Sequence, residues 1–139
     1  MRFRILQDFA TLELNEKSKT IWGSIWVELG GRSFPEVQWS DMSVAFLVDL
    51  LLVANEVDEG SVNLYRVRFF DGPYWVTIGG ARENAIEVHA NDPDEQGAAT
   101  ITKSEFVATV RRAATSLLEA CQERGWSEYS DVRRLAANL

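Results

Sequence analysis

The sequence has one cysteine and one histidine among 139 residues, and this scarcity excludes several kinds of site. A single cysteine cannot form an internal disulfide. Cys121 falls in an expected helix, where a buried and unreactive thiol is the ordinary outcome. One histidine and one cysteine would need two or more carboxylates to complete a zinc site, and no spacing indicates one. We therefore expect neither a metal nor a cofactor.

Long hydrophobic runs are also absent. The longest covers residues 44–54, VAFLVDLLLVA, and contains an aspartate, whereas a membrane-crossing helix needs about 20 apolar residues. Residues 1–14 alternate between polar and apolar types, unlike the solid apolar stretch of a signal peptide. Without an export signal or a disulfide, the chain is expected to be cytoplasmic, with no membrane partner.

Basic residues are outnumbered, because 14 Lys and Arg face 21 Asp and Glu, for a net charge of −7. Binding to a phosphate backbone needs a basic face, so nucleic acid is not an expected partner. Acidic residues gather between Glu83 and Glu95. This stretch either solvates a loop or faces a basic protein partner.

Alternation, helical periodicity and turn residues predict two strands, a helix, four strands and two helices. The strands are expected at 2–14, 20–29, 62–70, 74–80, 85–90 and 98–102, and the helices at 42–55, 103–124 and 129–137. Ser40 is the expected N-cap of the first helix, and Thr102 to Glu105 reads as a capping box. Together these elements predict one α+β domain over 1–139, with a single antiparallel sheet of about six strands and helices mainly on one face.

Two tryptophans suggest a binding surface. Trp22 and Trp26 alternate with an apolar stripe in the strand at 20–29, so they share its second face. If helices leave that face open, the indoles form a docking patch for a protein, with acids at its rim: Glu87, Asp92, Asp94 and Glu95. The alternatives are ordinary core packing and burial in a homodimer.

No catalytic signature is present. The Gly-Gly pairs at 30–31 and 79–80 match no phosphate-binding loop, and no serine or cysteine sits at a nucleophile elbow. The chain is therefore expected not to be an enzyme. The alternative is a small-molecule pocket between the helix at 42–55 and the sheet, with Asp49, Arg66, Arg68 and His89 as its candidates; Glu87 would accompany His89 as a base.

Two short motifs resemble a known group of proteins. Residues 34–41, FPEVQWSD, precede an apolar helix, and residues 70–74, FDGPY, follow some thirty residues later. This order is similar to that of small bacterial proteins related to the immunity proteins of polymorphic or contact-dependent toxin systems. The resemblance implies stoichiometric blocking of a cognate toxin. Toxins that attack nucleic acid are often basic, and an acidic binder would associate with them rapidly.

Overall fold

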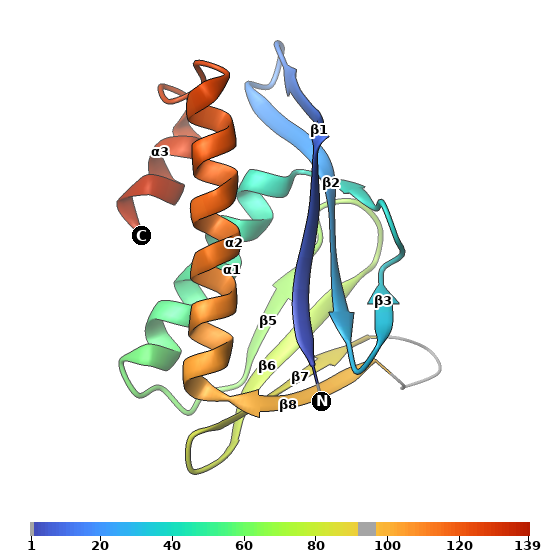
Figure 1. The fold of residues 1–139 in the computed structure, drawn as a ribbon, viewed down its shortest axis with the longest axis vertical. Coiled ribbons are helices and arrows are strands. Elements are labelled where there is room, and N and C mark those ends of the chain that lie inside the picture. The colour runs from blue at the N-terminus through green and yellow to red at the C-terminus, as the bar shows by residue number, and fades with distance from the viewer. Residues whose placement is uncertain (1, 92–96) are drawn as a thin grey trace.

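The computed structural model describes residues 2–91 and 97–139, apart from the side chains of residues 81 and 82. Figure 1 shows its elements. In chain order they are β1 (Phe3–Asn15), β2 (Thr20–Leu29), β3 (Arg32–Phe34), β4 (Ser40–Asp41), α1 (Ser43–Asp58), β5 (Tyr65–Arg68), β6 (Trp75–Arg82), β7 (Ala85–Ala90), β8 (Ala98–Thr102), α2 (Lys103–Glu123) and α3 (Ser130–Ala137).

The strands form two antiparallel sheets of four strands each. β1, β2 and β3 lie in order in the first sheet, where β4 also pairs with β2, and β5 to β8 form the second. The expected α+β class is confirmed, but the single six-stranded sheet is wrong. Alternation shows which residues are extended, not which strands share hydrogen bonds. In Figure 1 both sheets pack on the same side of the helices.

The core is built around α1, which is buried on most sides, as its uniformly apolar sequence predicts. It contacts α2, α3, β2 and β5. The ring of Phe46 stacks on that of Phe69, just after β5, with centroids 4.2 Å apart. Thus one helix supports both sheets, and the molecule has one shared core.

The two longer helices begin differently from one another. The Thr102 hydroxyl accepts a hydrogen bond from the Glu105 amide at 3.1 Å, so the predicted N-cap of α2 is confirmed. For α1 the predicted cap is wrong, because its N-cap is Met42, without a side-chain bond. Ser40 is held in β4 instead, where it pairs with Ser24 of β2.

A local irregularity bends the β1–β2 hairpin. Regular pairing ends at Asp8 opposite Ser24 and resumes at Glu13 opposite Trp22. The intervening residues carry Leu12 over Gly23, where a Cβ atom would lie only 2.7 Å from the leucine Cδ2. A bulge of this kind twists a strand locally. It separates the straight part of β1 from the tip of the hairpin.

In the described part of the chain, no helix is both long and apolar enough to cross a membrane. Nor do three or more metal-ligating side chains come together in it.

Candidate functional site

The outer face of the second sheet gathers the chain's clearest set of exposed functional side chains. Antiparallel register places Arg68 opposite Trp75, Arg66 opposite Thr77, and Thr77 opposite His89. Residues directly opposite one another project to the same side of a sheet. The intervening residues point inward and are buried, as Val67, Val76, Ile78 and Val88 show. We call the outward set the Arg–Trp face: Arg66, Arg68, Trp75, Thr77, Glu87 and His89.

The centre of the Arg–Trp face is an indole beneath two cations. The guanidinium carbon of Arg66 lies 4.5 Å from the Trp75 ring centroid, and that of Arg68 lies 5.4 Å from it. Each such contact is worth about 0.5–1 kcal/mol at an exposed site. In residues 2–91 and 97–139, no carboxylate forms a salt bridge with either arginine. Their N–H donors are therefore held in place and open to a partner.

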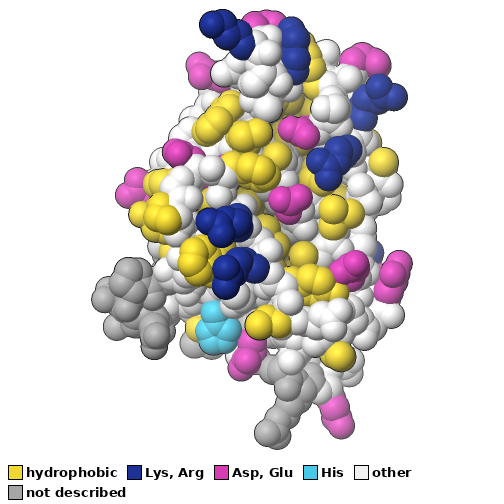
Figure 2. Space-filling model, turned by 180° about the vertical axis from the view of Figure 1, so that it is seen from behind, with side chains coloured by type: hydrophobic (Ala, Val, Ile, Leu, Met, Phe, Trp, Pro, Cys, Tyr) yellow, Lys and Arg dark blue, Asp and Glu magenta, His cyan; other side chains and the backbone are white. Residues whose placement is uncertain are grey.

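Apolar side chains border these arginines. Leu64 is 75% exposed and covers Gly79, which lies on the same side of β6 as Trp75 and Thr77. Phe70, just after β5, is 49% exposed. Figure 2 shows apolar and basic side chains mixed on this side of the molecule, next to the imidazole. Large apolar groups around rigid arginines are typical of protein-docking surfaces.

The imidazole of His89 lies at the edge of this face. Its Nε2 atom is 3.9 Å from the Glu87 carboxylate, and both side chains are about half exposed. The pair is thus open to water, and Thr77 uses its own hydroxyl to donate to the His89 carbonyl at 3.5 Å. No hydrogen-bonded chain of nucleophile, base and orienting group is formed here, as acyl-transfer catalysis would require.

The expected tryptophan patch on the first sheet is only partly exposed. Trp26 is 7% exposed, so the expectation that it lies open is wrong. It lies on β2, which has strands on both sides, and faces Leu6 of β1. Trp22 is half-buried, and its Nε1 donates to Thr20 at 3.2 Å.

The acids predicted at the rim of that patch lie elsewhere. Glu87 is exposed, on the Arg–Trp face. Asp92, Asp94 and Glu95 lie outside the described residues.

The four residues of the predicted pocket do not converge. Asp49, on α1, is half-buried near α3. Burial raises the pKa of its carboxyl group. The positive charge of Arg134 lowers that pKa, and the negative charge of Asp131 raises it further. Arg66, Arg68 and His89 instead lie on the outer face of the second sheet, because β5 turns Val67 toward the core and its arginines away from it. The prediction of a pocket lined by these four residues is therefore wrong.

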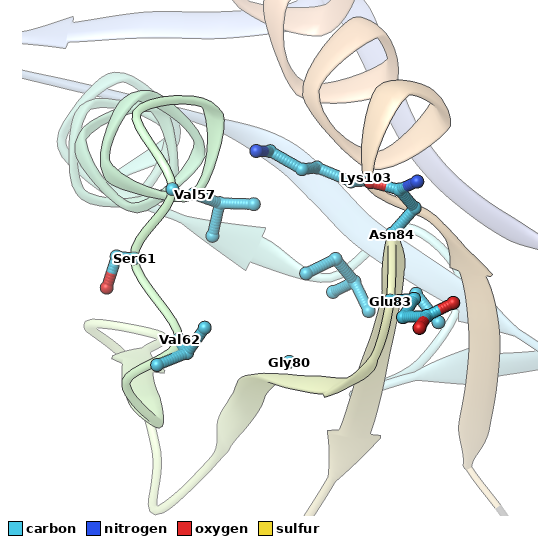
Figure 3. Close-up of a pocket in the computed structure, with 10 residues that line it drawn as sticks. Val57, Ser61, Val62, Gly80, Glu83, Asn84 and Lys103 are labelled. Atoms are coloured by element: carbon cyan, nitrogen blue, oxygen red, sulfur yellow. The ribbon is translucent and has the colours of Figure 1, made fainter.

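A different cavity lies between the end of α1 and the turn joining β6 to β7. It measures about 380 Å³ and is lined by Val57, Val62, Ile86, Lys103 and neighbouring residues. Figure 3 shows the ammonium group of Lys103 pointing toward α1, while the Glu83 carboxylate points away on the far side of the hairpin. The size suits a small molecule, but its charged groups diverge.

The two motifs behind the family resemblance meet in space. Tyr74 makes edge-to-face contacts with Phe34 at 5.7 Å and with Trp39 at 5.2 Å. The fully buried Asp41 carboxylate accepts N–H bonds from the 39–42 segment and from residues 70 and 71. These motifs therefore fix the start of α1 to the β5–β6 turn, which is a structural role.

Cys121 is buried, as expected. Burial raises the pKa of its thiol to about 11, against a smaller lowering effect of Arg124. At neutral pH the thiol stays protonated, so it is a poor nucleophile.

Sequence reasoning missed two members of the surface, Leu64 and Phe70, and did not place Trp75 beside the arginines. A signal did exist, since Arg-x-Arg and Trp-x-Thr stand on either side of one turn. Reading it required the register across that turn.

No protein-family model, curated protein or solved structure matches the chain.

Proposed function

We propose that this chain is a non-enzymatic binding module that docks a protein partner on its Arg–Trp face. The observation that carries the proposal is the pair of exposed guanidinium groups held over Trp75. Arginine and tryptophan dominate binding energy at protein interfaces. Groups that are already ordered lose less entropy when a partner arrives.

The partner that we favour is a basic toxin domain, which the chain would inhibit by stoichiometric binding. The family resemblance suggests this role, and the net charge of −7 would steer a basic protein toward the chain. Once docked, partner carboxylates or carbonyl groups would accept from Arg66 and Arg68. Long-range charge would thus set the encounter rate, and the Arg–Trp face would set the lifetime of the complex.

The test uses the purified domain encoded by a neighbouring toxin gene, with binding kinetics measured at low and high salt. We expect association to slow as salt rises, and Trp75→Ala to weaken binding about 30-fold or more. The matched control is Trp126→Ala, because Trp126 also lies beneath an arginine, Arg124, at 5.6 Å. That control should leave affinity unchanged.

Two results would contradict this proposal. Absence of binding at low salt would refute the assignment to this toxin. Equal affinities of the Trp75 and Trp126 variants would refute the assignment of the face.

A homodimer remains the alternative partner, and light scattering across dilution tests it. A dimer that persists at nanomolar concentration would favour an assembly role instead. For the cavity at Val57 and Lys103, a thermal-shift screen with metabolites tests a small-molecule role.

A further inference from the structure

One edge of the first sheet is open. In the described residues β1 pairs with β2 alone. The Arg2 carbonyl accepts from the Gly30 amide at 3.0 Å, so Arg2 turns its backbone groups toward β2. Because these directions alternate along an antiparallel strand, Phe3, Ile5 and Gln7 turn their N–H and C=O groups away from β2.

The opposite strand supports this direction. Ile25, which faces Gln7, donates its N–H to the Trp39 carbonyl on the far side of β2, at 2.8 Å. Gln7 and Ile25 therefore form a pair without hydrogen bonds between them. Within residues 2–91 and 97–139, the backbone groups of Phe3, Ile5 and Gln7 therefore pair with no strand, and such an edge is a template for another strand.

A groove runs along this edge, with α2 as its wall. It measures about 400 Å³, and its lining includes Ile5, Gln7 and Phe9 from β1, with Thr109, Arg112 and Ser116 from α2. The Gln7 side chain donates to the Ala113 carbonyl at 3.1 Å, which ties the helix to the strand. The groove is thus formed before any guest arrives. An edge strand beside a helix is the arrangement by which some domains capture extended peptides.

The charge of the groove selects its guest. Of the nine lining residues, only Arg4 and Arg112 are charged, and none is acidic. Arg4 lies 3.5 Å from Glu28, whereas Arg112 forms no salt bridge within 2–91 and 97–139. A second copy pairing here would bring like charges together without a carboxylate from either groove, which is unfavourable. An acidic guest would supply the missing charge.

We propose that the groove between β1 and α2 binds an extended acidic peptide segment by strand addition. The segment adds a strand beside Phe3–Gln7, spanning about 17 Å at about 3.4 Å per residue. Its backbone pairs with the outward groups of Phe3, Ile5 and Gln7, and its carboxylates, which lie on the α2 side of the added strand, face Arg112. This surface is separate from the Arg–Trp face, so the inference does not depend on the function proposed above.

The test uses a fluorescent, end-capped heptapeptide of alternating glutamate and valine. We expect it to bind the whole protein, and a lysine–valine peptide to fail. Arg112→Glu should weaken binding about tenfold or more, because it places a like charge beside the guest. Arg133→Glu, an exposed position on α3, is the matched control and should bind normally.

Backbone methylation distinguishes strand addition from simple charge attraction. N-methyl groups on alternate peptide nitrogens should abolish binding in one frame and leave it nearly unchanged in the other, since only alternate N–H groups face β1. The proposal fails if the acidic peptide does not bind at up to about 1 mM, if both frames behave alike, or if the Arg112 and Arg133 variants bind equally. Trp75→Ala should leave peptide binding intact, which separates this test from that of the Arg–Trp face.

Discussion

At the scale of single residues, Asp41 has the most demanding surroundings in the described chain. It is fully buried, and its carboxylate accepts from Trp39 Nε1 at 2.9 Å and from the amides of Met42, Phe70 and Asp71 at 2.7, 2.9 and 3.2 Å. A carboxylate has lone pairs enough for four donors, and an amide side chain does not. Sequence alone could not reveal donors that lie thirty residues away along the chain.

We expect Asp41→Ala to lower the free energy of unfolding by about 3 kcal/mol or more, because buried N–H groups lose a charged acceptor. Urea denaturation measures the change. Asp71→Ala is the matched control, since Asp71 is exposed in the adjoining turn, and its cost should stay within about 0.5 kcal/mol. Similar losses in the two variants would contradict the role given to Asp41.

Asp49 makes stability depend on pH. Burial, opposed by Arg134, raises its native pKa above the 3.8 of an unperturbed side chain. The unfolded chain therefore releases this proton first as pH rises, and stability falls until the native carboxyl has ionised as well. Below pH 3.8 the carboxyl is protonated in both the native and the unfolded chain, so Asp49 no longer lowers stability.

We expect Asp49→Asn to be more stable than the natural chain at pH 7, with a gain that shrinks as pH falls through the native pKa. Thermal melts between pH 7 and acid pH measure this difference. A gain at pH 7 that persisted at acid pH would show that packing, not ionisation, causes it.

At the scale of elements, the three helices and six of the strands were predicted from the sequence, whereas the short strands β3 and β4 and the pairing partners were not. Helix α2 begins at its predicted capping residue because that signal is local. Helix α1 begins late because pairing of β4 with β2, a contact between distant segments, holds Ser40 and Asp41. The Arg–Trp face was predicted only in part, because it too depends on pairing between separate segments. Both arginines were candidates, but Trp75 joins them only through register across a turn, and a slip of one residue would reverse its face.

The cap of α2 offers a quantitative check. Thr102→Ala removes the acceptor for the Glu105 amide and should cost about 1 kcal/mol of unfolding free energy. Thr115→Ala makes the same change at an exposed position within α2, where alanine is the better helix former, so stability should stay level or rise slightly. Denaturant midpoints measure both effects. If Thr102→Ala behaved like Thr115→Ala, the cap would contribute nothing.

At the scale of the whole molecule, the two sheets depend on one core. Phe46 of α1 stacks on Phe69 beside the second sheet, and α1 also contacts β2 of the first. No sequence pattern marks such a meeting point, because α1 is apolar on nearly every side. We infer that the sheets unfold together.

Phe46→Ala should therefore destabilise both sheets, by about 3–5 kcal/mol. Hydrogen exchange of backbone amides measures the loss sheet by sheet. Phe70→Ala, at an exposed ring, is the control and should cost less than about 0.5 kcal/mol. Loss of protection in only one sheet would show that they are separate folding units.

The contact between Phe3 and Phe106 also bears on how the chain is made. Their rings stack at 5.6 Å, which joins the first strand to the first turns of α2. The ribosome synthesises β1 long before α2. The apolar face of the first hairpin therefore stays exposed while about a hundred residues are translated at 5–20 residues per second. We therefore expect the nascent hairpin to bind a chaperone during those seconds.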